Sequence, residues 1–184
     1  IEWLQTQDRL PMWRQLAVFL RALAHAHGKT GDRWVSKGTY HGTQLNIIHH
    51  AIPNAKLVYC HRDPVDNLGS VCSLMDKLRG AFSDQTDRKE IGRYAVDYWS
   101  ARLRDFIEVR KRMPKHAVLD LQFPDIVKRM PAVIEKVYAF AGISLTDEAR
   151  AAHAAWEREN SQHKHGRHDY ELADYGLSRE MIAE

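Results

Sequence analysis

A strand-length apolar run that stops abruptly and leads straight into a helix constrains this fold more than any other feature. Residues 56–60, KLVYC, form a short continuous apolar run that is typical of a buried strand. The run ends at His61-Arg62-Asp63-Pro64, and the amphipathic segment 64–79 predicts a helix. Pro64 suits the first helical turn, and Asp63 is placed to cap it. A strand joined to a helix by so short a turn is typical of α/β proteins with parallel strands.

The rest of the chain alternates between helices and strands in the same way. Pro131 predicts that one helix begins or kinks there, and Thr146 is placed to cap the next. The chain has 184 residues and no low-complexity linker, which predicts one domain over residues 1–184 with a mainly parallel sheet flanked by helices. The predicted elements are helices over 11–27, 42–52, about 90–112, 125–141 and 147–159, an extended segment at 34–37, a strand at 117–123 and a loop-like tail at 161–178.

Composition and charge exclude several classes of protein. The formal net charge of +3 allows an anionic ligand but lacks the clustered basic stripe of a nucleic-acid-binding protein. The longest apolar runs are far too short for a membrane span. Two cysteines, Cys60 and Cys72, predict a reducing, cytoplasmic location, and both are expected to be buried and inert. Because the first residue is Ile1, the sequence leaves open what precedes it.

The turn after the strand has the residues of a phosphate site. Ligands of open α/β sheets bind outside the carboxyl ends of the strands, where Arg62 lies. The start of the following helix favours an anion, and a guanidinium matches two phosphate oxygens. Ser70 follows Arg62 by eight residues, so its hydroxyl could reach the same anion. The alternative, which these two residues alone leave about equal, is that Arg62 pairs with Asp63 or Asp66 and Ser70 only packs.

The stretch PNAKLVYCHRDPVDNLGSVCSL resembles the 3′-phosphate-binding segment of sulfotransferases that use 3′-phosphoadenosine 5′-phosphosulfate (PAPS). In that family an arginine ends the strand in an R-[DN]-P turn and a serine follows eight positions later. The resemblance implies that Arg62 and Ser70 bind the 3′-phosphate of the nucleotide. It also implies a P-loop NTPase-like sulfotransferase fold.

Further segments resemble the same family, so that the resemblance runs from about residue 33 to the end. Lys37, in RWVSKGTYHG and 25 residues before Arg62, matches the catalytic lysine of tyrosylprotein and related bacterial sulfotransferases. VLDLQFPDIV resembles the D-x-x-Y-E-D-L segment, which implies that Phe123 stacks on adenine. The tail HKHGRHDYELADYGLS resembles the basic C-terminal loop of bacterial members, which implies nucleotide-binding roles for Lys164 and Arg167.

One family feature has no counterpart in these residues. The family begins with a strand and an R-[ST]-G-[ST]-[ST] loop that cradles the 5′-phosphosulfate, and no such loop occurs in the sequence. Gly28-Lys29-Thr30-Gly31 lacks the preceding apolar strand and fits a surface turn. We therefore expect a sulfotransferase fold that is N-terminally incomplete, without the first strand, the glycine-rich loop or the base that activates the acceptor.

The predicted function is transfer of a sulfuryl group from PAPS, as co-substrate, to a hydroxyl or amine acceptor, without a metal. A small molecule, a carbohydrate or a peptide could be the acceptor, and the sequence leaves the oligomeric state open. The missing loop motivates an alternative, a degenerate module that binds nucleotide or a partner without catalysis. A P-loop phosphotransferase is disfavoured because no Walker lysine motif is present. A metal site at His163, His165 and His168 is also disfavoured, because basic residues are mixed in and no Cys or Glu completes the set.

Overall fold

The structure is a computed structural model that describes residues 6–31, 33–38, 41–160 and 170–183. The chain divides into two compact units, which are described separately. The first unit comprises residues 1–59 and 103–119, and the second comprises 60–102 and 120–184. The longest helix and both strands contribute residues to each unit.

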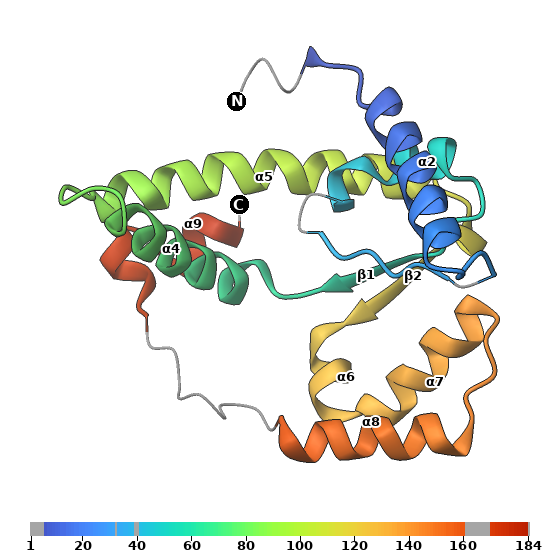
Figure 1. Cartoon of the computed structure of the whole chain (residues 1–184). Coiled ribbons are helices and arrows are strands. Elements are labelled where there is room, and N and C mark those ends of the chain that lie inside the picture. Colours follow the sequence, from blue (N-terminus) through green and yellow to red (C-terminus); the bar gives the residue numbers. More distant parts are fainter. Residues whose placement is uncertain (1–5, 32, 39–40, 161–169, 184) are drawn as a thin grey trace. The chain divides into compact units, whose positions relative to one another are not determined.

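Helices and two strands alternate along the described chain (Figure 1). The strands β1 and β2 are hydrogen-bonded neighbours and run in the same direction, so the predicted α/β fold with a parallel sheet flanked by helices is confirmed. The elements are α2 (Leu10–Ala26), η1 (His41–Gln44), α3 (Leu45–Ala51), β1 (Leu57–His61), α4 (Pro64–Gly80), α5 (Arg88–Arg112), η2 (Lys115–Ala117), β2 (Val118–Gln122), α6 (Phe123–Lys128), α7 (Met130–Ala141), α8 (Asp147–Glu159), η3 (Leu172–Tyr175) and α9 (Arg179–Ala183).

The first unit has a small core between the sheet, α3 and the end of α5. Tyr59 of β1 stacks on Phe106 of α5, with ring centroids 4.0 Å apart and planes at 20°. The stacked rings contribute to the stability of this core, because an aromatic ring removes a large apolar area from water. The buried members of this cluster are Leu45, Phe106, Met113, Ala117 and Val118.

A buried hydrogen bond joins α2 to the residue before α3. The indole Nε1 of Trp13 donates to Oε1 of Gln44 at 2.7 Å, and both side chains are buried. The bond satisfies two polar groups that would otherwise be costly to bury. His41 packs edge-on against the same indole ring. The N-terminal helix is therefore held by a specific polar contact in addition to apolar packing.

The structure corrects two of the predicted strands. Residues 34–37 form no strand, and their side chains are exposed, with Val35 95% exposed. An extended segment needs a neighbouring strand, and in the described part of the chain β1 and β2 pair only with each other. The strand predicted over 56–60 does form, as Leu57–His61, but one face of it is exposed, as Val58 at 43% shows.

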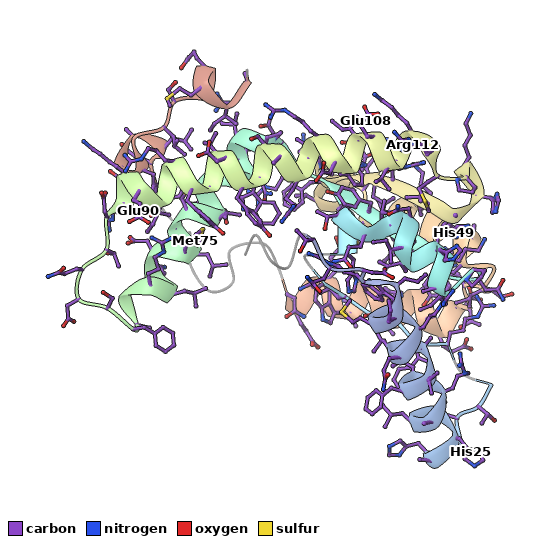
Figure 2. The ribbon with its side chains drawn as sticks, turned by 90° about the horizontal axis from the view of Figure 1, so that it is seen from above. His25, His49, Met75, Glu90, Glu108 and Arg112 are labelled. Carbon is purple, nitrogen blue, oxygen red and sulfur yellow. The ribbon has the colours of Figure 1, made fainter. Side chains whose placement is uncertain are left out.

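The second unit is built around α4, the first half of α5 and the C-terminal segment. Its buried cluster consists of Leu68, Cys72, Ile91, Ala95, Tyr175 and Leu177, and Met75, labelled in Figure 2, packs against it. The prediction that the tail over 161–178 is loop-like is therefore wrong for its last part, because η3 forms and Tyr175 and Leu177 are buried. Apolar residues of the tail pack against α4 and α5. Their spacing is irregular, so the sequence periodicity does not predict this packing.

Prolines and capping residues set the helix boundaries in the rest of the second unit. The helix predicted over 125–141 is two helices, α6 and α7, with Arg129 between them and Pro131 in the first turn of α7. Thr146 caps α8 as predicted, its hydroxyl oxygen accepting from the backbone N–H of Ala149 at 3.2 Å. None of the described helices combines the length and apolarity required to cross a membrane.

The two cysteines have different environments. Cys72 is fully buried, as predicted, but Cys60 is exposed because it lies on the uncovered face of β1. Desolvation raises the pKa of both thiols, that of Cys72 to about 11. Both thiols are therefore mostly protonated at neutral pH, and only Cys60 can meet a reagent in the folded protein.

We expect one thiol to react with a chromogenic disulfide reagent at pH 8 in the folded protein and two after unfolding. The reaction of Cys60 should be slower than that of free cysteine, because its raised pKa lowers the thiolate fraction. Cys60→Ser should abolish the native reaction, and Cys72→Ser should leave it unchanged. Equal reaction rates for both thiols in the folded protein would contradict this burial pattern.

Candidate functional site

The turn between β1 and α4 has the predicted geometry. Asp63 caps α4, its carboxylate Oδ1 accepting from the backbone N–H of Val65 at 2.8 Å. Pro64 occupies the first turn, where its missing N–H leaves no hydrogen bond unmade. β1 ends at His61, so Arg62 lies between the carboxyl end of the strand and the start of the helix. This is the position at which α/β proteins bind ligands.

Arg62 and Phe123, predicted separately from sequence, lie together. The guanidinium carbon Cζ of Arg62 is 4.8 Å from the centroid of the Phe123 ring, which is a cation–π contact. Arg62 is exposed, and among the described residues it forms no ion pair with Asp63 or Asp66. The structure therefore does not favour the alternative in which those carboxylates neutralise the arginine.

Phe123 differs from the prediction in its local structure. It was expected to be the last residue of a strand, but β2 ends at Gln122 and Phe123 is the first residue of α6. Pro124 explains the early helix start, because proline suits the first turn of a helix and suits a central strand poorly. The ring is half-buried, and the Arg62 guanidinium lies over it.

Ser70 lies two turns into α4 and is half-buried. It follows the cap Asp63 by seven positions, and seven steps of about 100° bring it back to nearly the same side of the helix. The helix dipole places partial positive charge at this end, while Asp63 and Asp66 offset part of it. The exposed positive charge of Arg62 is therefore the main attraction for an anion at this end of α4.

A histidine–aspartate pair at the carboxyl ends of the strands was missed from sequence. Nε2 of His61, the last residue of β1, lies 2.8 Å from the carboxylate Oδ1 of Asp120 on β2. Both side chains are about one-third exposed, at 30% and 32%. The alternation of side chains along two adjacent strands could have suggested this pair, but the register between the strands could not be read.

The C-terminal segment contacts α4 next to Ser70. The hydroxyl of Tyr170 donates to the backbone carbonyl of Asp66 at 3.1 Å. A Cβ at Gly69 would lie 2.5 Å from the Tyr170 ring, so the glycine permits this close approach. Residues 104 positions apart thus meet within the first two turns of α4, a contact that sequence reasoning did not find.

The remaining predicted residues belong to the other unit or fall outside the described residues. Lys37 is exposed in an irregular segment of the first unit, whereas Arg62, Ser70 and Phe123 belong to the second. Lys164, Arg167 and the three histidines His163, His165 and His168 lie outside the described residues. In the described part of the chain, no group of three or more His, Cys, Asp or Glu residues could hold a metal ion.

Family comparison agrees with this geometry. A sequence model described as the Sulfotransferase family matches residues 5–147, which is most of the chain. The chain therefore belongs to the sulfotransferase family. The match begins well before residue 33, where the motif resemblance starts, so α2 is also part of the family region. No curated protein is matched by the chain.

Two solved structures are similar over nearly the whole chain. Sulfotransferase STF9 from Mycobacterium avium matches with a TM-score of 0.83 and 22% identity, covering 96% of this chain and 45% of that one. Sulfotransferase STF1 from Mycobacterium tuberculosis H37Rv matches with a TM-score of 0.78 and 29% identity, covering 98% and 46%. The predicted P-loop-like sulfotransferase fold is confirmed, and the chain spans less than half the length of either structure.

Proposed function

We propose that this protein is a PAPS-dependent sulfotransferase that transfers a sulfuryl group to a hydroxyl or amine acceptor. The observation that carries the proposal is the exposed Arg62, held over Phe123 at the junction of β1 and α4. An arginine beside an aromatic ring suits a ligand with an anion and a planar base. Family membership supports the same chemistry.

The residues present fit the 3′-phosphoadenosine half of the co-substrate. Arg62 can offer two parallel N–H donors to the 3′-phosphate, and Ser70 can add a hydroxyl from the second turn of α4. Phe123 can stack on adenine through the part of its ring that is not buried. Lys164 and Arg167 are proposed as further nucleotide ligands on the resemblance alone. The 3′-phosphate is the group that distinguishes PAPS from ATP.

Lys37 is the proposed catalytic residue. PAPS supplies the sulfuryl group, and negative charge builds on the leaving phosphate oxygen as the group departs. A lysine ammonium at that oxygen stabilises the transition state more than the ground state. Lys and Arg side chains can thus neutralise the leaving group without a metal ion. A small molecule, a carbohydrate or a peptide would serve as acceptor, and a cytoplasmic location remains part of the proposal.

A second candidate function is nucleotide binding without catalysis. It is supported by the same contact, Arg62 over Phe123, which suits nucleotide binding without requiring turnover. Such a module would use Arg62, Ser70 and Phe123 in the same way but would not turn over PAPS. Turnover of PAPS to 3′,5′-ADP by the protein would exclude it.

We expect the protein to bind 3′,5′-ADP at least tenfold more tightly than 5′-AMP, measured by titration calorimetry. Arg62→Ala should abolish most of this preference, because a charge-assisted hydrogen bond contributes about 1.5–3 kcal/mol. The loss should appear in the affinity for 3′,5′-ADP and hardly at all in that for 5′-AMP.

Arg79→Ala provides a matched control. Arg79 is also an arginine over an aromatic ring in the second unit, with its Cζ 6.0 Å from the Tyr94 centroid, but it lies at the other end of α4. Its replacement should leave the preference within about twofold of the unaltered protein. Equal affinities for the two nucleotides in the unaltered protein would refute the proposed function.

A further inference from the structure

The His61–Asp120 pair joins the two strands at the point where the proposed site begins. Nε2 of His61 and Oδ1 of Asp120 are 2.8 Å apart, which is a short, charge-assisted geometry if the ring is protonated and a good hydrogen bond if it is neutral. In either state Nε2 donates, because a carboxylate can only accept.

The pair occupies the polar end of an otherwise apolar sheet face. Side chains alternate along a strand, so Leu57, Tyr59 and His61 share one face of β1. Toward the start of the strand this face is covered, since Tyr59 stacks on Phe106. At its end the aromatic covering gives way to His61 and Asp120, each about one-third exposed. On this face the strand ends are therefore joined by a polar contact, while Leu121 is buried on the other face of β2.

Each member of the pair lies close in sequence to one of the site residues. Arg62 directly follows His61, and Phe123 is the third residue after Asp120. The guanidinium of Arg62 reaches the Phe123 ring only if the ends of β1 and β2 keep their separation and direction. Backbone hydrogen bonds within a two-stranded sheet hold such ends weakly. The side-chain bond between His61 and Asp120 adds a constraint across the strand ends.

Stabilising the fold does not by itself explain why a negative charge, that of Asp120, lies beside the proposed site. A carboxylate on the strand that leads to Phe123 opposes the binding of an anionic ligand, because like charges repel. An exposed ion pair of this kind contributes little to stability. A role in positioning the residues beside it accounts for a carboxylate at this place.

From these contacts we infer that His61 and Asp120 are positioning residues that hold Arg62 over Phe123 and so determine the preference for a 3′-phosphate. The inference rests on the proposed function for its ligand, but the geometry that it describes exists without ligand. Neither residue touches the reacting atoms. His61 acts through Arg62, which follows it directly, and Asp120 acts through Phe123, three residues further on.

Four variants and one control distinguish the effect of the His61–Asp120 hydrogen bond from the effect of the charge on Asp120. Asp120→Ala and His61→Ala remove the bond. Asp120→Asn keeps an oxygen that accepts from Nε2, and His61→Gln keeps a side-chain N–H that can donate to Asp120. Glu135→Ala breaks an exposed ion pair with Arg150 in the same unit and serves as the matched control.

The first readout needs no ligand. The side-chain protons of Arg62 lie over an aromatic ring, so their NMR resonances should be shifted upfield in the unaltered protein. We expect Asp120→Ala and His61→Ala to reduce this shift by half or more, and Asp120→Asn, His61→Gln and Glu135→Ala to retain it. An unchanged shift in Asp120→Ala would overturn the inference.

The second readout is the affinity ratio of 3′,5′-ADP to 5′-AMP. We expect the two alanine variants to lower it about fivefold, and the asparagine, glutamine and Glu135→Ala variants to keep it within about twofold. Equal losses in Asp120→Ala and Asp120→Asn would overturn the inference, because charge and not the hydrogen bond would then matter. If the unaltered protein shows no preference, the proposed function fails, and the NMR shift still decides whether the pair positions Arg62.

Discussion

Replacing Lys37 with alanine should slow the turnover of PAPS to 3′,5′-ADP by about 10²–10³-fold, which is typical for removal of one group that stabilises developing charge. The reason is that the ammonium is proposed to act on the leaving phosphate oxygen, where charge grows only as the sulfuryl group departs. Turnover should be measured from labelled PAPS, with water and with a panel of phenol, sugar and peptide acceptors.

Binding provides the second half of this prediction. The affinity for 3′,5′-ADP should change less than about threefold in Lys37→Ala, because a residue that acts in the transition state contributes little to ground-state binding. Lys29→Ala, an exposed lysine in the same unit, should leave both turnover and affinity unchanged. A Lys37→Ala variant with full turnover would remove Lys37 from the mechanism.

The sequence predicted the parts of the site that depend on local chemistry. The order strand, Arg62, cap and Pro64 follows from short-range rules about proline, capping and apolar runs, and the structure has the same order. The same rules located α8 through Thr146 and the boundary between α6 and α7 through Pro131.

Contacts between distant residues could not be predicted in the same way. The His61–Asp120 pair depends on the register of two strands that are far apart in the chain, and a one-residue change of register would turn either side chain to the other face. The exposure of Cys60 depends on which face of β1 is covered, which an apolar run alone does not reveal. Lys37 was predicted to lie in an extended segment, but that segment has no partner strand in the described residues.

Gly92→Ala should destabilise the protein by about 3 kcal/mol, even though alanine favours helix over glycine by about 1 kcal/mol. Gly92 is buried in α5, and a Cβ there would overlap the backbone carbonyl oxygen of Tyr175 and lie 3.0 Å from the carbonyl carbon. Backbone atoms cannot rotate away as a side chain can, so either α5 or the C-terminal segment must shift. Urea unfolding followed by circular dichroism measures the change in the free energy of unfolding.

Alanine substitutions at two other helical glycines should have smaller effects on stability. Gly80, at the end of α4, has no atom within 4 Å of its ideal Cβ, so Gly80→Ala should be neutral or stabilising by up to about 1 kcal/mol. Gly69→Ala should fall between the two, because its Cβ would meet the Tyr170 ring, which can move. The destabilisation should increase in the order Gly80, Gly69, Gly92. At Gly80 the new Cβ meets no atom, at Gly69 it meets a side chain that can move, and at Gly92 it meets the backbone. If Gly92→Ala were as stable as Gly80→Ala, the C-terminal segment could not be packed on α5, and the buried positions of Tyr175 and Leu177 would be wrong with it.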